Sequence, residues 1–323
     1  MRRSRLLLGI IAIVVVAAGG LVAAGPRLQD EGYDVPWLAP KTPYVANLKA
    51  TVVHQGELGA VLVAPTLKPD LQAVAGSITG LRGVSALRFS HLGRSWVALI
   101  PVSYNNQPGD YPVALTITDH KGRTHEITLT ITVETSTFTA SSQYLQLSPE
   151  VNSLRTPDKI AQDAAKTAAA KAAPAPEPLW TGPFVRPVES DKVTTEFGHA
   201  RYINGVFQGR HSGIDWGGVG AGAPVVAANS GKVVLATMLY ASGNTVMIDH
   251  GLGLFSSYLH LSALEVAAGD MVAAGDLIGL TGSTGVSTGP HLHFTLWVGD
   301  VATNPWPWFE RDPMELLILD GGD

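Results

Sequence analysis

The sequence has no cysteine among its 323 residues. This absence excludes disulfide bonds, thiolate metal sites and cysteine nucleophiles. Charged residues are also scarce, at 15%, and the formal net charge of −5 provides no basic surface of the kind that binds nucleic acid. We therefore expect no nucleic-acid partner. Hydrophobic residues, at 46%, are sufficient for large packed cores, and the length favours two domains with additional segments.

The N-terminal 26 residues contain a long apolar run. Leu6 to Gly25 carries no charge and follows Arg2, Arg3 and Arg5. Twenty apolar residues can span a bilayer as a helix, and leading arginines favour the cytoplasmic side. We predict an N-terminal membrane helix over residues 1–26, acting as a signal anchor or, since Val22–Ala24 resembles a cleavage site, as a signal peptide. The rest of the chain is then expected on the periplasmic side of the inner membrane, anchored there or released after cleavage.

Residues 46–135 read as short strands separated by turn residues. Stretches such as "TVVHQGELGAVLVAP" and "SWVALIPVSY" alternate with period two and are rich in valine, isoleucine and threonine. The clearest hairpin runs from Val113 to Thr118, turns at residues 119–122, and returns from Glu126 to Val133. Several such strands in about 90 residues predict an immunoglobulin-like β-sandwich.

Residues 136–187 are expected to connect this sandwich to the rest of the chain. Thr156 can cap a helix that begins at Pro157 and continues through an alanine-rich stretch to about Ala173, before the "PAPEP" sequence ends it. The helix has few large apolar residues to bury. We interpret it as a surface helix and a semi-rigid spacer.

Residues 188–312 are dense in glycine and in short β-prone runs, which predicts an all-β domain. Its candidate functional residues are His211 and Asp215 in "GRHSGIDWGG", His260 in "YLHLS", and His291 and His293 in "PHLHF". Residues i and i+2 of a strand share a face, so the last two histidines should project side by side. Zinc takes imidazole and carboxylate ligands, and catalytic sites use three protein ligands with one open position for water. The pattern therefore indicates a catalytic zinc site.

The same stretches, together with "GAPVVAANSGKVV" and "VAAGDMVAAGDLIGLTGSTGVSTGPHLHF", resemble the lysostaphin-type (LytM-like) zinc metallopeptidases. The resemblance implies one zinc ion per chain, with His211, Asp215 and His293 as ligands and with His260 and His291 as the catalytic pair. The stretch from Gly93 to Gly122 is also similar to an immunoglobulin-like domain that precedes the peptidase in some members. Many relatives have an acidic residue after H-x-H-Phe, where this chain has Thr295; we expect no effect on activity from this difference.

The resemblance implies a zinc-dependent endopeptidase that hydrolyses peptide cross-links of bacterial peptidoglycan, with the peptide stems as its substrate. Two alternatives remain open from the sequence. Some relatives lose ligands and act as non-enzymatic activators of cell-wall amidases, although all five candidate residues are present here. D-alanyl cross-links and glycine bridges are both cut within the family, and the predicted anchor favours the D-alanyl type. The β-sandwich is expected to position the peptidase, bind a protein partner or inhibit the site.

Overall fold

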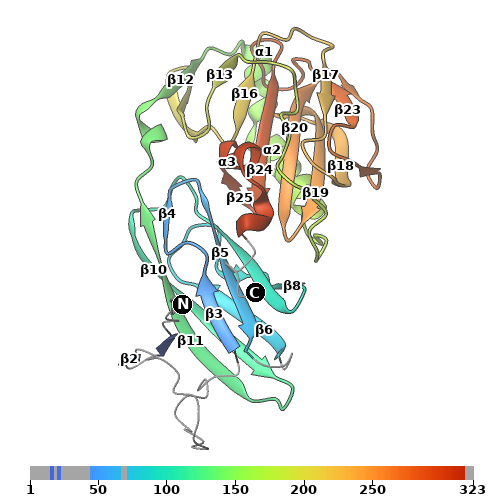
Figure 1. Ribbon diagram of the computed structural model, residues 1–323. Helices are drawn as coiled ribbons and strands as arrows, with labels where there is room; N and C mark the ends of the chain where they lie inside the picture. The colour runs from blue at the N-terminus through green and yellow to red at the C-terminus, as the bar shows by residue number, and fades with distance from the viewer. Residues whose placement is uncertain (1–14, 18–19, 23–43, 67–70, 317–323) are drawn as a thin grey trace, which may run out of the picture. The chain divides into compact units, whose positions relative to one another are not determined.

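The computed structural model describes residues 15–17, 20–22, 44–66 and 71–316 (Figure 1). The chain divides into two compact units, Met1–Lys41 and Thr42–Asp323. Most of the predicted membrane helix lies outside the described residues. Its described part is extended rather than helical, because β1 (Val15–Ala17) pairs with β2 (Gly20–Val22), and a valine-rich run also has high strand propensity. No helix among the described residues is long and apolar enough to cross a membrane. Anchoring therefore stays a prediction.

The second unit is mainly β, as predicted, and begins with two sheets that share one core. Their strand orders are β4-β11-β10-β6-β7 and β3-β5-β9-β8. The strands are β3 (Tyr44–Leu48), β4 (Val52–His54), β5 (Leu58–Pro65), β6 (Leu71–Ile78), β7 (Ala86–Leu87), β8 (Ser90–Leu92), β9 (Ser95–Pro101), β10 (Gly109–Asp119) and β11 (Thr124–Glu134). The immunoglobulin-like assignment stays a prediction.

The hairpin of β10 and β11 confirms the predicted alternation and turn. Val113, Leu115 and Ile117 of β10 are fully buried and belong to the core between the two sheets. The Asp119 carboxylate closes the turn by accepting backbone N–H groups of Lys121 and Arg123 at 2.8 and 3.0 Å. Period-two patterning thus places one face of this hairpin in the core.

The connector contains β12 (Ser142–Leu145), α1 (Pro149–Asn152) and α2 (Pro157–Ala170). Helix α2 begins at Pro157 after Thr156, as predicted, and remains largely at the surface. The interpretation as a spacer is wrong, because the connector packs on the region that follows it. Strand β12 pairs in parallel with β14 (Ala200–Ile203), and the buried Asp163 carboxylate of α2 accepts N–H groups from residues 240 and 241.

The C-terminal region is built on a large sheet of order β13-β16-β24-β20-β19-β18-β22, with β25 beside β24. Smaller sheets have the orders β12-β14-β15 and β17-β23-β21. The remaining elements are β13 (Val193–Thr195), β15 (Val206–Arg210), β16 (Ile214–Trp216), β17 (Pro224–Val226), β18 (Gly231–Leu239), β19 (Gly243–Gly251), β20 (Leu254–Leu261), β21 (Ala263–Leu264), β22 (Met271–Val272), β23 (Leu277–Leu280), β24 (Leu292–Val298), β25 (Val301–Thr303) and α3 (Trp306–Glu310).

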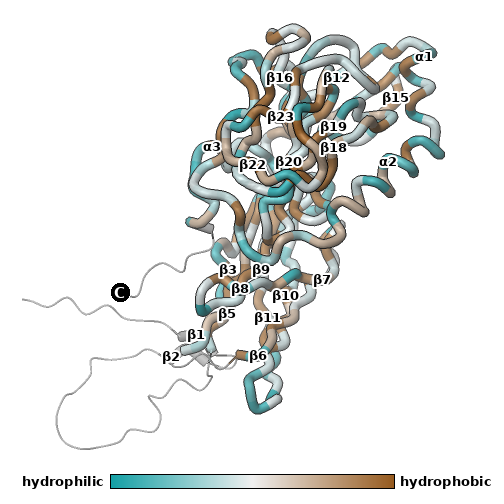
Figure 2. The backbone as a smooth tube through the Cα atoms, turned by 90° about the vertical axis from the view of Figure 1, so that its right-hand side faces the viewer, coloured by the Kyte–Doolittle hydropathy of each residue, from teal (hydrophilic) through white to brown (hydrophobic). Residues whose placement is uncertain are grey.

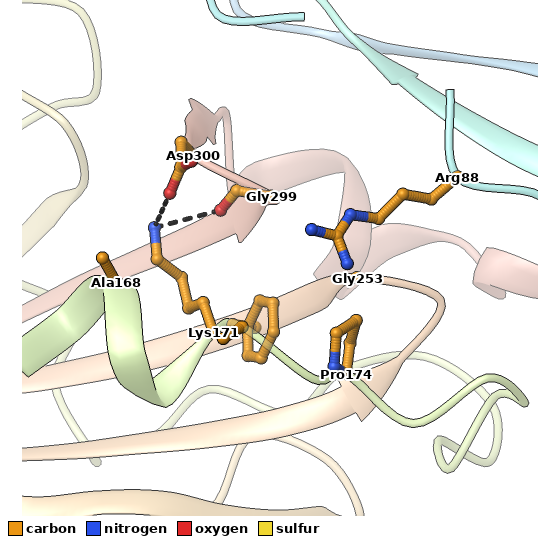
Figure 3. Close-up of a pocket in the computed structure, with 9 residues that line it drawn as sticks. Arg88, Ala168, Lys171, Pro174, Gly253, Gly299 and Asp300 are labelled. Carbon is orange, nitrogen blue, oxygen red and sulfur yellow. Dashed lines mark hydrogen bonds and ion pairs between the residues drawn. The ribbon is translucent and has the colours of Figure 1, made fainter. Parts of the chain in front are cut away.

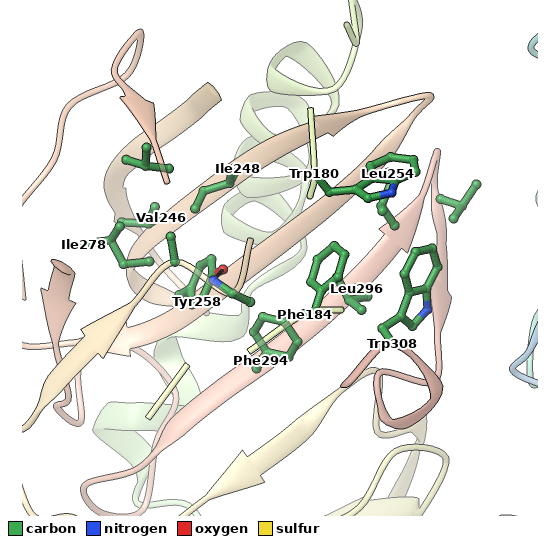
Figure 4. Packing of buried hydrophobic residues seen from close by; sticks show 14 of the residues in the cluster. Trp180, Phe184, Val246, Ile248, Leu254, Tyr258, Ile278, Phe294, Leu296 and Trp308 are labelled. Atoms are coloured by element: carbon green, nitrogen blue, oxygen red, sulfur yellow. Dashed lines mark hydrogen bonds between the residues drawn. The ribbon is translucent and has the colours of Figure 1, made fainter. Parts of the chain in front are cut away.

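One face of the large sheet carries a buried core. Figure 2 shows apolar stretches along its strands, and Figure 4 shows Tyr258, Phe294 and Leu296 packed beside Phe184 and Trp308. The hydroxyl of Tyr258 keeps a partner despite complete burial, because it accepts the Ala228 N–H at 2.7 Å. This packing fixes the strands from which the candidate residues project.

The core of the C-terminal region also includes residues of the N-terminal sandwich, namely Ala60, Leu62, Val97 and Leu99. The Asn304 N–H donates to the Gly56 carbonyl at 2.7 Å across the same contact. A small cavity nearby, of about 90 Å³, is lined by Arg88 of the sandwich, by the end of α2 and by the turn after β24 (Figure 3). There Lys171 donates to Asp300 at 2.7 Å. The exact domain boundaries stay a prediction.

Candidate metal centre

The centre is built on two neighbouring strands of the large sheet. Asp215 of β16 lies directly opposite His293 of β24 in the strand pairing. Ile214 and Phe294, the next residues along each strand, are fully buried in the core, so Asp215 and His293 share the other face. Gly213 permits this close approach, because a Cβ atom there would collide with the backbone oxygen of Phe294.

Three donor atoms converge at this point. Oδ1 of Asp215 lies 2.7 Å from Nδ1 of His293 and 3.0 Å from Nε2 of His211, and the two ring nitrogens are 2.9 Å apart. All three side chains are buried, with His211 completely inaccessible. Among the described residues, these three form a group of histidine and acidic side chains that could hold a metal ion. The structure therefore brings together the three ligands that the sequence predicted.

The donor set fits zinc. Ligand bonds of about 2.0–2.1 Å in a tetrahedron place ligand atoms about 3.3 Å apart, a few tenths of an ångström more than the distances here. Two imidazole nitrogens and one carboxylate oxygen are ligands that zinc accepts, and three protein ligands leave one coordination position for water or substrate. The residues present thus match a catalytic rather than a closed structural site.

Each ligand histidine is oriented by a partner on its other nitrogen. Nδ1 of His211 is 2.9 Å from the Glu196 carbonyl, so it carries the proton and leaves Nε2 for the centre. Nε2 of His293 is 2.8 Å from Oγ1 of Thr295, which leaves Nδ1 for the centre. The sequence reading treated Thr295 as dispensable and missed this contact. The period-two spacing of residues 293 and 295 was the signal that could have revealed it.

The two predicted catalytic histidines lie beside the three donors. His260 lies at the end of β20. The centroid of its ring is 4.8 Å from the ring centroid of His291 and 6.2 Å from that of His293. Nδ1 of His260 is 2.8 Å from the Thr284 carbonyl, and Nδ1 of His291 is 2.8 Å from the Gly289 carbonyl. Each ring is therefore held at Nδ1, and Nε2 is its free nitrogen. Nε2 of His291 lies 3.8 Å from Asp215 Oδ1.

The backbone at His260 is unusual. Its φ of 64° lies in the left-handed region, which few non-glycine residues adopt. Such conformations cluster at functional sites, where the surrounding structure imposes them. Here the amide of His260 donates to the Ser242 carbonyl at 2.9 Å, which helps to fix the turn at the end of the strand.

Burial sets the charge state of the centre. It lowers the pKa of His260 to about 3, with His291 and His293 nearby as further causes, and lowers that of His293 to about 4 despite the Asp215 carboxylate. Burial alone would raise the pKa of Asp215, but the adjoining His211 and His293 rings outweigh it and hold that pKa well below the usual range. The carboxylate is therefore charged and the imidazoles of His260 and His293 are neutral at neutral pH, as metal ligation and proton acceptance require.

A cavity of about 470 Å³ opens onto these residues. Asp215, His260, His291 and His293 line it, together with Gln143 of β12 and Arg201 of β14. The sequence reading did not identify Gln143 or Arg201, because neither belongs to a spaced motif. Tyr202, next to Arg201 on β14, does not line the cavity and stacks on Tyr144 with 5.0 Å between the ring centroids.

The comparisons with known proteins agree with this geometry. Peptidase family M23 matches residues 209–305, which include every candidate ligand and catalytic residue. The chain is 38% identical to glycyl-glycine endopeptidase ALE-1 of Staphylococcus capitis over 127 residues, which are 39% of this chain and 34% of the relative. It is 36% identical to the DD-carboxypeptidase/endopeptidase Mpg of Neisseria meningitidis over 121 residues, 38% of this chain and 28% of the relative. The match thus spans about a third or less of these curated relatives.

Among solved structures, a protein from Pseudomonas aeruginosa assigned to peptidase M23 has a TM-score of 0.55, covering 79% of this chain and 93% of its own. At 24% sequence identity, this likeness shows the shared fold alone. The match over residues 209–305 and the sequence relatives identify the family. Residues 209–305 are a peptidase family M23 domain, of the lysostaphin type that the motifs of this region indicate.

Proposed function

We propose that this protein is a zinc-dependent endopeptidase that hydrolyses peptide cross-links of bacterial peptidoglycan. One observation carries the proposal: three buried ligand atoms converge beside two histidines whose free nitrogens adjoin an open cavity. The names of two relatives, a glycyl-glycine endopeptidase and a DD-carboxypeptidase/endopeptidase, support a peptide substrate. The family membership supports a metallopeptidase.

The chain's own residues divide the work between holding a metal and moving protons. His211, Asp215 and His293 would hold the zinc ion, which when bound would supply a Lewis acid to polarise a carbonyl and acidify water. His260 is neutral and its free Nε2 can accept a proton from the attacking water. The proton taken from water can then pass to the leaving amine, either directly from His260 or through His291, whose ring centroid is 4.8 Å from that of His260. Positioned acid–base groups of this kind contribute roughly 10²–10⁴-fold to rate.

Purified sacculi test the proposal directly. The zinc-loaded protein should release muropeptides that mass spectrometry identifies, chelation should abolish this release, and His260→Ala should reduce it roughly 10²-fold or more. Metal content and circular dichroism of the variant serve as controls for folding. Zinc-loaded protein that releases nothing from sacculi, yet increases the activity of an added amidase, would favour the alternative role as an activator.

We further propose that the peptidase faces the periplasm, with residues 6–25 in the inner membrane or removed after export. The arginine-flanked apolar run supports this location. Fractionation checks it: the protein should be recovered with the membranes or in the periplasm, and an intact chain found wholly in the cytoplasm would contradict it. The N-terminal sandwich is the part we propose for binding a protein partner.

A further inference from the structure

Arg201 is a cationic residue in the wall of the cavity. It lies on β14, and its side chain is only 27% exposed. Its Nε donates to Gln143 Oε1 at 2.8 Å, whereas its Nη2 is 3.9 Å from Asp215 Oδ2, too far for a hydrogen bond. In the described part of the chain, neither terminal nitrogen has an acceptor within hydrogen-bonding distance. The N–H groups that can form a fork around a carboxylate are therefore available.

Gln143 holds this guanidinium in place. Its amide nitrogen donates to Thr195 Oγ1 at 2.7 Å, which directs its amide oxygen to Arg201 Nε. Strand β12, which carries Gln143, is itself paired with β14 along residues 142–145. A guanidinium fixed at Nε loses less conformational entropy when its terminal nitrogens bind a ligand.

The charge of the cavity wall favours an anionic group at this position. Arg201 and Lys192 both line the cavity, and the one carboxylate among its lining residues, Asp215, belongs to the metal-ligand set. The terminal nitrogens of this half-buried guanidinium have Asp215, 3.9 Å away, as a counter-charge but no hydrogen-bond acceptor, and a bound carboxylate would satisfy them through two charge-assisted hydrogen bonds. Because Asp215 is committed to the metal-ligand set, the guanidinium of Arg201 can bind an anionic group of the substrate.

We propose that Arg201 is a specificity-determining residue that binds a carboxylate of the substrate next to the amide to be cleaved. This inference rests on the proposed peptidase function. Because the guanidinium is 3.9 Å from a ligand carboxylate, the substrate carboxylate must lie within about one residue of the reacting carbonyl. A leaving amine that bears a free carboxylate, as at a peptide C-terminus or in a cross-linking diamino diacid, meets this requirement. The interior of a glycine bridge does not.

Matched peptides that differ in one charge test the assignment. The full-length zinc-loaded protein is assayed on a stem peptide ending in D-Ala-D-Ala and on a tetraglycine, each with a free C-terminal carboxylate and as its C-terminal amide. For whichever peptide is cleaved, the free acid should have a KM at least about 10-fold lower than the amide, as expected for a charge-assisted pair. Cleavage of acid and amide with equal KM would overturn the inference and leave the proposed function intact.

Variants assign the preference to a residue. Arg201→Gln should remove the discrimination with zinc content unchanged, and Arg201→Lys should retain part of it. Arg155→Gln removes the same charge from a nearby residue that does not line the cavity, and it should keep the full preference. If Lys192→Gln rather than Arg201→Gln removes the discrimination, the assignment to Arg201 is wrong.

A binding experiment separates this inference from the peptidase function. The metal-free protein is titrated with the same peptides and followed by NMR. Tighter binding of the acids than of the amides, lost in Arg201→Gln, would support the inference even if no peptide were hydrolysed. Equal binding of both forms by the unmodified protein would overturn it.

Discussion

At the scale of single residues, four histidines of the centre follow one rule. Each has one ring nitrogen held by a fixed acceptor of the scaffold, which leaves the other nitrogen for chemistry. For His211, His260 and His291 the acceptor is a backbone carbonyl, whereas for His293 it is a threonine hydroxyl. Fixing one nitrogen selects the tautomer and the ring orientation before any ligand binds. The roles of the histidines differ because of where the free nitrogen lies: those of His211 and His293 are within 3.0 Å of Asp215 Oδ1, whereas that of His291 is 3.8 Å away.

The separation of roles among the histidines leads to the first prediction. His293→Ala removes one of three ligands, so both zinc and hydrolysis should be lost. His260→Ala and His291→Ala remove no ligand, so zinc should stay near one per chain while hydrolysis falls roughly 10²-fold or more. Metal analysis and muropeptide release from each purified variant measure both quantities.

Circular dichroism of the same variants provides the folding control. If His291→Ala loses zinc while His293→Ala keeps it, the assignment within residues 291–293 is inverted. Full activity of His260→Ala would leave His291 as the sole proton carrier.

Thr295 should matter for metal affinity, contrary to the reading of the sequence. Thr295→Val keeps the shape of the side chain but removes the partner of His293 Nε2, so zinc affinity should fall about 10- to 100-fold, the usual effect of losing such a partner. Competition with a chelator of known affinity measures the change. Thr303→Val is the matched control, because Thr303 is also buried and its hydroxyl donates to the Leu296 carbonyl rather than to a candidate ligand. Equal affinities of Thr295→Val and the unmodified protein would contradict the role.

At the scale of helices and strands, the sequence predicted the features that depend on residues close together in the chain. The alternation of polar and apolar residues in "HLHFTL" predicted that His293 lies on the face of β24 that points away from the core. The period-two alternation and the turn residues likewise predicted the hairpin of β10 and β11. What it missed depends on contacts distant in sequence. The docking of α2 through Asp163 and the pairing of β12 with β14 join segments more than 50 residues apart, and neither leaves a periodic signal. Arg201 was missed for the same reason, because its role is inferred from its contact with the distant Gln143 and from its position in the cavity wall.

The docking of α2 can be measured through Asp163. Its carboxylate accepts the backbone N–H groups of Tyr240 and Ala241 at 2.9 and 2.8 Å. Asp163→Ala leaves both donors without their partner, so the free energy of unfolding should fall by about 2–4 kcal/mol. Urea denaturation measures it. Asp158→Ala, in the exposed first turn of the same helix, should cost below about 1 kcal/mol. A similar small loss for both variants would show that α2 is not docked through Asp163.

At the scale of the whole second unit, stability and the charge of buried histidines are linked. The N-terminal sandwich contributes residues to the core beneath the metal centre, so both regions stabilise the strands that position it. Within that core, His250 is completely buried between the Ser230 carbonyl and the Ser256 hydroxyl, at 2.8 Å from each. Burial lowers its pKa from 6.5 to about 4. Like His260 and His293, it is neutral in the folded protein at neutral pH, and its protonation costs stability.

The consequence is a loss of stability in mild acid. Between pH 6.5 and about 4 the unfolded chain binds a proton at His250 that the folded chain does not, so the stability that is fully present above pH 6.5 falls as the pH decreases through this window. The contribution of His250 is on the order of 3 kcal/mol at full effect. Urea denaturation of the metal-free protein at pH 7, 5 and 4 should show the decline. His250→Gln should be less stable at pH 7 but should lose less on acidification, because it has no proton to gain. The same pH dependence in both proteins would show that protonation of His250 does not contribute, and that the acid sensitivity arises at the metal centre, where His260 and His293 are held neutral in the same way.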